Sequence, residues 1–227
     1  MTMDSRLAKL IAALFVLTML MGMVDAYGAA PILRGPVGEI RLHCAVVLAG
    51  ALMRLLMSLG VVLIAVAYFP VVRRYSEAIA VSYLGFRVAE GVLLALGVCA
   101  HVVLLGLGES FASAAPAARA AFPTLQSLAL SFTNTTYQMA MTALGLAGTI
   151  QAVLLFSTRL VPRWIAGLGI VGYWLLFLSG PLDLAGAIDT TAGLGALMYV
   201  PGGLFELFFL PSWLFFRGFV PSKGGTR

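Results

Sequence analysis

Long runs of apolar residues dominate the chain, and short stretches rich in glycine, proline and arginine separate them. Six runs reach the roughly 20 residues that a helix needs to cross the hydrocarbon core of a bilayer. They cover residues 7–27, 41–69, 79–107, 125–156, 164–184 and 194–216. None shows the period-two alternation of a transmembrane strand. We therefore expect an all-α, polytopic bundle of about six spans that forms one integral membrane domain over residues 1–227.

The segments between these runs predict the connections. Glycines and prolines within 28–40 mark a loop, and the Ala-, Ser- and Pro-rich stretch 108–123 is predicted as the longest loop. Pro70 is expected to end the second span. The first run begins like a secretory signal, but Asp25 lies beside the small residues, so we expect a retained helix.

The basic residues of the connections predict the orientation, because cytoplasmic loops carry an excess of Lys and Arg. One side holds nine, namely Arg6, Lys9, Arg73, Arg74, Arg159, Arg163, Arg217, Lys223 and Arg227. The other side holds three, namely Arg34, Arg41 and Arg119. We therefore expect both termini in the cytoplasm, which also requires an even number of spans.

Composition excludes several classes of protein. Charged residues make up 10% of the chain and apolar residues 61%, whereas soluble domains carry about 25% charged residues. The six spans leave no room for a soluble catalytic or nucleic-acid-binding domain. The net charge of +5 is explained by loops that face anionic lipid, so membrane lipids are expected partners and nucleic acid is not.

Two arginines, Arg54 and Arg87, lie within the apolar runs, as do Glu90 and Glu206. A charge near the centre of a bilayer costs at least about 2.5–3.5 kcal/mol on insertion scales. Such residues are therefore expected to face the interior of the bundle and to be paired. Two cations and two carboxylates provide the balance that pairing needs.

The third run places several polar residues on one helical face. Arg87 and Glu90 are three residues apart, and His101 follows Glu90 after about three full turns. Leu94 lies on the same stripe and Gly97 is close to it. The stripe is interpreted either as a salt-bridge network that fixes helix packing or as a polar cavity for a ligand, a proton or an ion.

The last run is interrupted around a carboxylate. Glu206 lies between Pro201 and Pro211, and proline bends or breaks a helix because it lacks a backbone N–H. A broken helix beside a midplane carboxylate is typical of transporter binding sites. The alternative is a plain kink in which Glu206 pairs with Arg54 or Arg87.

The half of the bundle away from the termini holds further polar residues. Asp25, His101, Tyr137, Gln138 and Asp183 are candidates to converge on an outward-open pocket. The same side chains are equally suited to hydrogen bonds with one another and with the loops.

Histidines and cysteines offer little metal chemistry. Bis-imidazole haem ligation by His43 and His101 is possible by position, and Cys44 and Cys99 add suitable ligand types for a metal. Their depths in the membrane match poorly, and the sequence has no nucleophile, phosphate-loop or paired-cysteine motif. We expect packing histidines and buried thiols, with no cofactor and no metal.

Four stretches carry a resemblance to a known family. They are MGMVDAY at 21–27, LGFRVAEGVLLALG at 84–97, LVPRWIAGLGIVGYWLLFLSG at 160–180 and GGLFELFFLPSWLFFRGF at 202–219. Together they resemble a large bacterial multi-pass family that is catalogued as domain of unknown function 4386. The resemblance covers most of the chain.

The resemblance implies a helical fold in the bacterial inner membrane and no established catalytic activity. Asp25, Arg87, Glu90 and Glu206 match the polar pattern of the family. Arg54 has no mapped counterpart in it.

Three hypotheses follow for function. In the first, a non-enzymatic protein binds or moves a small hydrophobic or amphipathic molecule between spans one, three and six. Arg87 would anchor an anionic group, and Glu90 and Glu206 would be counter-charges or proton carriers. Asp25, Arg54 and His101 complete the candidate buried set.

The second hypothesis is a subunit or scaffold that packs against another membrane protein. Gly85, Gly91, Gly97 and the glycines between 167 and 172 would allow close helix contact. The third hypothesis is a membrane enzyme or haem carrier that uses His101. Of the three hypotheses, the sequence favours the non-enzymatic ones over this one.

Overall fold

The computed structural model describes residues 3–190 and 193–220, and all regular structure in these residues is helical. Six helical stretches are long and apolar enough to cross a membrane. They cover Ser5–Arg34, Val37–Arg73, Glu77–Ser113, Ala118–Thr158, Arg163–Leu184 and Gly193–Phe216. The predicted all-α bundle with six candidate spans is confirmed. Lys223 and Arg227, used in the orientation argument, lie outside the described residues.

Several of the six stretches are compound. The first contains α1 (Met3–Val24), the π-helical turn η1 (Asp25–Ala29) and α2 (Ala30–Arg34). The second contains α3 (Val37–Ile40), the 3₁₀ turn η2 (Arg41–His43) and α4 (Cys44–Arg73). The next three are α5 (Glu77–Ser113), η3 (Ala118–Ala121) with α6 (Phe122–Thr158), and α7 (Arg163–Leu184). The last contains α8 (Gly193–Leu197), α9 (Val200–Leu204), the π-helical turn η4 (Phe205–Phe209) and α10 (Leu210–Phe216).

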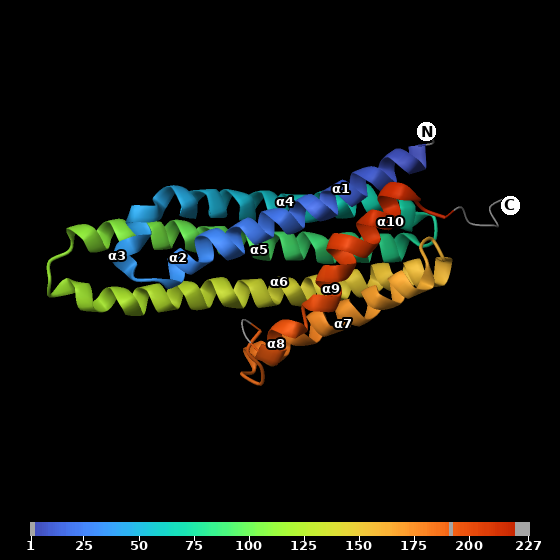
Figure 1. Cartoon of the computed structure of the whole chain (residues 1–227). Helices are drawn as coiled ribbons and strands as arrows, with labels where there is room; N and C mark the ends of the chain where they lie inside the picture. The colour runs from blue at the N-terminus through green and yellow to red at the C-terminus, as the bar shows by residue number, and fades with distance from the viewer. Residues whose placement is uncertain (1–2, 191–192, 221–227) are drawn as a thin grey trace.

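Helices that follow one another in sequence pack side by side. The long helices α4, α5 and α6 form the centre of the bundle, α1 and α2 cross it on one side, and α7 packs along α6 (Figure 1). The last span closes the bundle, because α9 packs on α7 and α10 packs on α1. The start of α1 and the end of α10 lie at the same end of the molecule (Figure 1). The cytoplasmic location of that end stays a prediction.

The core is apolar, and so is the outer surface of the helices. Tyr68, Tyr83, Tyr173, Phe15 and Phe205 are among the largest fully buried side chains. Large aliphatic residues such as Leu48, Leu52 and Leu59 are about half exposed on α4. Apolar side chains on both the inner and outer faces suit a bundle whose solvent is lipid.

The predicted loop over 28–40 is wrong. Helix continues to Arg34 and resumes at Val37, so only Gly35 and Pro36 break it. Pro31 lies in the first turn of α2, directly after the π-helical turn. It has no backbone N–H to donate. Glycine and proline persist within helices in a membrane because neighbouring segments and local π or 3₁₀ adjustments satisfy the freed backbone groups.

Two further boundaries differ from the sequence expectation for the same reason. Pro70 does not end the second span, because it lies inside α4, which continues to Arg73. The predicted loop 108–123 shrinks, because α5 continues to Ser113 and α6 begins at Phe122 with Pro123 in its first turn. The helices are correspondingly longer than the predicted spans.

Candidate functional site

Both interrupted spans place a buried carboxylate in a π-helical turn. Asp25 begins η1 and Glu206 is the second residue of η4, and each turn is followed by a proline in the next α-helical segment. The N–H of Ala30 bonds to the Asp25 carbonyl and that of Leu210 to the Phe205 carbonyl. These five-residue spacings are π-type bonds, which often mark functional sites. The last span departs from regular α-helix around Glu206 as predicted, through a π-helical turn in a continuous helix. The equivalent turn at Asp25 was not predicted.

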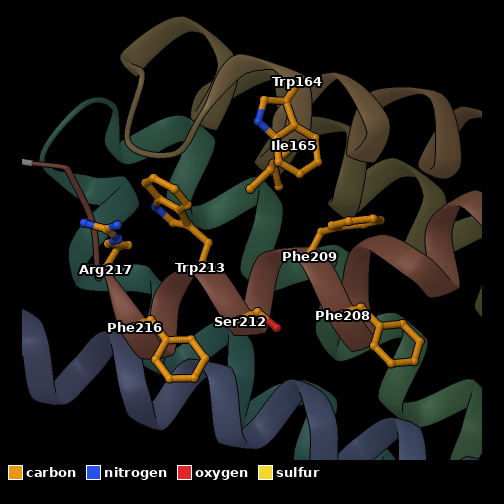
Figure 2. A pocket seen from close by; sticks show the side chains of 8 residues that line it. All are labelled: Trp164, Ile165, Phe208, Phe209, Ser212, Trp213, Phe216 and Arg217. Atoms are coloured by element: carbon orange, nitrogen blue, oxygen red, sulfur yellow. The ribbon is translucent and has the colours of Figure 1, made fainter.

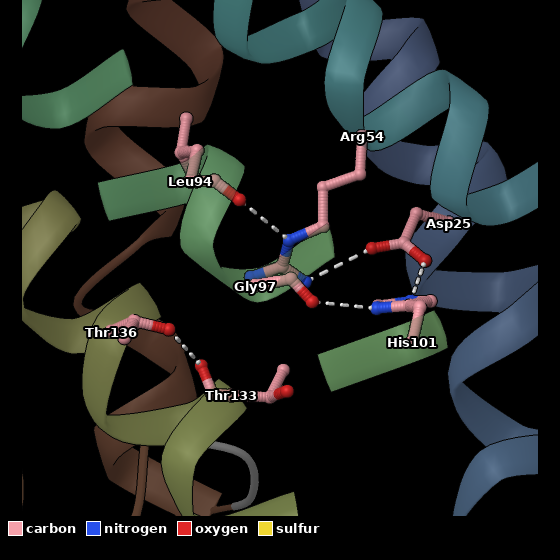
Figure 3. A network of polar contacts seen from close by, with 7 residues as sticks. All are labelled: Asp25, Arg54, Leu94, Gly97, His101, Thr133 and Thr136. Atoms are coloured by element: carbon pink, nitrogen blue, oxygen red, sulfur yellow. Dashed lines mark hydrogen bonds and ion pairs between the residues drawn. The ribbon is translucent and has the colours of Figure 1, made fainter. Parts of the chain in front are cut away.

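Asp25, Arg54 and His101 form the first buried ionic group, which we call the histidine cluster. Asp25 Oδ2 is 3.1 Å from Arg54 Nη1, and Asp25 Oδ1 is 2.9 Å from His101 Nε2 (Figure 3). The exposed fractions of Asp25, Arg54 and His101 are 5%, 8% and 1%. The cluster therefore joins the first three spans in a setting from which solvent is largely excluded.

Backbone groups of α5 complete this cluster. The carbonyl of Gly97 is 2.9 Å from His101 Nδ1, and Arg54 Nε donates to the carbonyl of Leu94 at 3.4 Å (Figure 3). A Cβ at position 97 would lie 2.6 Å from Arg54 Nη2. Glycine at 97 is therefore what lets the guanidinium lie against the backbone of α5.

One edge of the Arg54 guanidinium has no acceptor among the described residues. Its Nη2 is buried without a hydrogen-bond partner, and so is the hydroxyl of Thr133 on α6. Arg54 also lies 5.7 Å from the ring centroid of Tyr137. Thr133 lies one helical turn before Tyr137, on the face of α6 turned toward this cluster (Figure 3). Two unsatisfied polar groups therefore border the same region between α4, α5 and α6.

The second buried ionic group, the double-carboxylate cluster, contains Arg87, Glu90 and Glu206. Arg87 Nη1 is 2.9 Å from Glu90 Oε2, and Arg87 Nε donates to the carbonyl of Val61 at 3.4 Å. Glu206 Oε1 accepts a hydrogen bond of 2.8 Å from the hydroxyl of Tyr173. The predicted Arg87–Glu90 neighbourhood is confirmed, and the whole predicted stripe of α5 is buried.

The six predicted site residues thus separate into two clusters that share α5. Arg54 pairs with Asp25, so the alternative in which it pairs with Glu206 is wrong. Glu206 interacts electrostatically with Arg87, but the hydrogen bond it makes is with Tyr173. Tyr173 is a site residue that the sequence interpretation missed, because a lone Tyr in an apolar run carries no distinguishing signal. Thr133 was not singled out from the polar residues that follow it in sequence.

The remaining polar residues of the predicted outward pocket form a separate network. Asp183 Oδ1 accepts hydrogen bonds of 2.9 Å from both the backbone N–H and the hydroxyl of Thr190. Gln138 bonds to Thr190 and accepts a bond of 2.9 Å from the hydroxyl of Tyr199. These bonds tie the segment that follows α7 to α6, so Gln138 and Asp183 support the fold at that point.

The two predicted haem ligands lie in different surroundings. Both ring nitrogens of His101 are engaged, as described above. His43 is exposed and bonds to the carbonyl of Glu39. The expectation of buried thiols is wrong, because Cys44 and Cys99 are exposed on the outside of the helices. Within residues 3–190 and 193–220 no group of three His, Cys, Asp or Glu could hold a metal ion.

Two shallow grooves lie away from both clusters. One, of about 450 Å³, runs between the start of α7 and α10 and is lined by Trp164, Phe209, Trp213 and Arg217, among others (Figure 2). The other, of about 480 Å³, lies near Pro36 at the opposite end of the bundle. Both are largely apolar, and neither contains a residue of the predicted site.

The fold and these clusters define a class: a six-span helical membrane protein with two buried ionic groups and two π-interrupted spans. The family described as Domain of unknown function (DUF4386) matches residues 10–218. Because this match covers most of the chain, the protein belongs to that family. No curated protein and no solved structure matches the chain.

Proposed function

We propose that the protein binds or moves a small amphipathic molecule, whose polar head contacts the histidine cluster inside the bundle. The observation that supports this most directly is the pair of buried, unpartnered polar groups, Arg54 Nη2 and the Thr133 hydroxyl. A buried donor without an acceptor costs roughly 1–3 kcal/mol, and more when it is charged. A bound polar head would remove that cost.

The proposal assigns the polar head of the ligand to a different arginine from the one expected from the sequence. Arg87 faces Glu90 at 2.9 Å and interacts with Glu206 nearby, so its guanidinium already has two carboxyl partners within the protein. Arg54 faces one carboxylate and keeps one unpartnered nitrogen. The anchoring role therefore moves from Arg87 to Arg54.

The surroundings favour a ligand that is apolar beyond its head. The two clusters are separated by apolar segments of the bundle, and the large buried side chains near them are aromatic or aliphatic. The π-helical turns place both carboxylates where the regular α-helix is interrupted, and interrupted helices are a feature of transporter binding sites. We place this activity in a bacterial inner membrane, as the family resemblance implies, with both termini in the cytoplasm, as the basic residues of the connections predict.

The glycine pattern speaks against the scaffold hypothesis. Most of the glycines that suggested contact with another protein are used within the chain: a Cβ at 91 would lie 2.8 Å from the Ser58 carbonyl, and one at 169 would lie 2.7 Å from the ring of Phe205. Gly85 and Gly167 alone of that set face open space. They are too few to form a continuous seam for a partner.

Native mass spectrometry of the detergent-purified full chain tests the proposed function. We expect the wild type to carry a small-molecule adduct, which Arg54→Gln loses. Arg119→Gln is the matched control, because Arg119 also lies over an aromatic ring, that of Phe111, but near the exposed turn before α6. An adduct retained equally by both variants, or a wild-type protein that takes up no added amphipathic molecule, would count against the proposal.

A further inference from the structure

The hydrogen-bond geometry of the histidine cluster fixes its net charge. The carbonyl of Gly97 can only accept, so His101 Nδ1, 2.9 Å away, carries a hydrogen. One further proton lies between His101 Nε2 and Asp25 Oδ1, which are also 2.9 Å apart. Whether that proton belongs to the imidazolium or to the carboxylic acid, His101 and Asp25 together are neutral.

Arg54 is permanently protonated, so the cluster as a whole carries one positive charge in either proton arrangement. The charged groups that interact with Asp25 are His101 and Arg54. The next carboxylate along α5 is Glu90, which is four residues from Leu94 and seven from Gly97, so it lies about 6–10 Å along the helix axis from the backbone that Arg54 contacts. Glu90 is also already paired with Arg87 at 2.9 Å.

The distance to Arg54 decides whether the double-carboxylate cluster can replace an anion in direct contact with its guanidinium. Coulomb attraction varies inversely with separation, so a charge at about 6–10 Å attracts roughly 1.5- to 2.5-fold more weakly than one at about 4 Å. A distant carboxylate also accepts no hydrogen bond from the unpartnered Arg54 Nη2. A contact anion would satisfy both the charge and the hydrogen bond.

We propose that the head of the ligand is a single carboxylate, held by Arg54 Nη2 and the Thr133 hydroxyl, so that the molecule recognised is a monocarboxylate with an apolar tail. This inference rests on the proposed function and narrows it to a class of ligand. One negative charge matches the single positive charge of the cluster. Two unpartnered donors match the two oxygens of a carboxylate, whereas a phosphate group with three free oxygens and more charge would remain under-satisfied.

The ring of Tyr137 defines one wall of this carboxylate site. Arg54 Cζ lies 5.7 Å from its centroid, so the guanidinium is covered on that side by an aromatic face. Figure 3 shows the Thr133 side chain on α6 opposite the α5 segment that carries Gly97 and His101. The carboxylate would therefore lie between α5 and α6, next to the guanidinium edge that the protein leaves unpaired.

Three ten-carbon probes with different heads separate this inference from the proposed function. Isothermal titration of the purified full chain with decanoate, decanol and decyltrimethylammonium compares an anion, a neutral molecule and a cation on one tail. We expect decanoate to bind about tenfold or more tightly than decanol, and the cation to bind most weakly. If decanol or the cation matched decanoate, the carboxylate inference would fail while the proposed function stood. If none of the three bound, the proposed function itself would fail.

A conservative variant at Thr133 tests where the carboxylate head of the ligand binds, without removing a charge from the protein. Thr133→Val deletes the unpartnered hydroxyl at nearly constant volume, so the fold is expected to be retained. We expect it to weaken decanoate binding by about three- to tenfold and to leave decanol binding within twofold. Thr149→Val is the matched control, because that hydroxyl on α6 bonds to the Gly145 carbonyl at 2.7 Å. Equal decanoate affinity in both variants would overturn the assigned position.

Discussion

At the scale of single residues, Asp25 is the carboxylate on which the histidine cluster depends. It accepts from Arg54 and contacts His101 at the two oxygens of one side chain. Asn at position 25 would keep the shape but remove the charge that opposes a buried guanidinium. Removing one partner of a buried ion pair costs about 3–5 kcal/mol.

We therefore expect Asp25→Asn to lower the free energy of unfolding by about 3–5 kcal/mol, measured by equilibrium unfolding in mixed micelles. The double variant with Arg54→Gln should recover part of that loss, because it no longer buries an unopposed charge. Additive losses in the double variant would show that Asp25 and Arg54 are not energetically coupled.

The double-carboxylate cluster predicts unequal roles for its two acids. Glu90 makes the direct ion pair with Arg87, whereas Glu206 accepts from the Tyr173 hydroxyl through Oε1. An amide at 206 keeps an acceptor oxygen for Tyr173. We expect Glu206→Gln to cost less than about 1.5 kcal/mol and Glu90→Gln to cost about 3 kcal/mol or more in the same unfolding assay. The reverse order would identify Glu206 as the main partner of Arg87.

Residue-scale prediction from sequence succeeded within a helix and failed between helices. The stripe of Arg87, Glu90 and His101 follows from the helical period alone, and all three are buried. The Asp25–Arg54 pair joins residues on two spans, and its geometry depends on how those spans rotate and pack. No periodicity within one span contains that information.

At the scale of elements, the last span is held by backbone contact with α7. A Cβ at Gly172 would lie 2.7 Å from the Cα of Gly202 and 2.9 Å from the carbonyl carbon of Pro201. These atoms belong to the backbone of α9, so they cannot move aside as a flexible side chain would. Small residues permit this approach, which is a common device between membrane helices.

We expect Gly172→Ala to destabilise the protein by about 1–3 kcal/mol, because overpacking at a rigid contact forces the helices apart. Gly167→Ala is the control on the same helix, since a Cβ there meets nothing within 4 Å. Thermal unfolding in detergent should show a lower midpoint for the first variant and little change for the second. Similar midpoints for both would contradict the tight α7–α9 contact.

Element boundaries were predicted less well than element identity, for a physical reason. Pro31, Pro70 and Pro123 were interpreted as loop or end signals, yet each lies within or at the first turn of a helix. In water such residues often end helices, but in lipid an exposed loop would leave its backbone polar groups without partners. The chain therefore keeps helix through them, with a π-helical turn before Pro31 and a 3₁₀ turn before Pro123.

At the scale of the whole molecule, the fold places the start of α1 and the end of α10 at the same end of the bundle (Figure 1). The N–H of Val220 donates to the carbonyl of Leu160 in the α6–α7 turn at 2.9 Å, which joins the C-terminal end of the described chain to that end of the bundle. Arg73, Arg74 and Arg163 lie in turns or helix ends on the same side. The excess of basic residues predicts that this end is cytoplasmic.

Cysteine labelling in intact cells tests that orientation. In a chain with Cys44 and Cys99 replaced by Ala, we expect Ser113→Cys at the end of α5 to react with a membrane-impermeant maleimide. Tyr75→Cys, in the turn between α4 and α5, should react only after lysis. Both positions are exposed, so access is decided by the side of the membrane. The opposite labelling pattern would reverse the predicted topology.

The number of spans and the common end of the termini follow from apolar run length and the distribution of basic residues. The division of the buried charges into two clusters does not, because it depends on which helices touch. Along α5, Gly97 and His101 belong to one cluster and Arg87 and Glu90 to the other. One helical stripe therefore serves two sites.

An experimental structure of the wild-type protein with decanoate bound tests the central claim most directly. The account predicts carboxylate oxygens within hydrogen-bonding distance of Arg54 Nη2 and the Thr133 hydroxyl, with the tail among the apolar helices. A decanoate found only in the groove lined by Trp164 and Trp213 (Figure 2) would contradict it. So would a structure in which Arg54 Nη2 bonds to an acceptor of the protein itself.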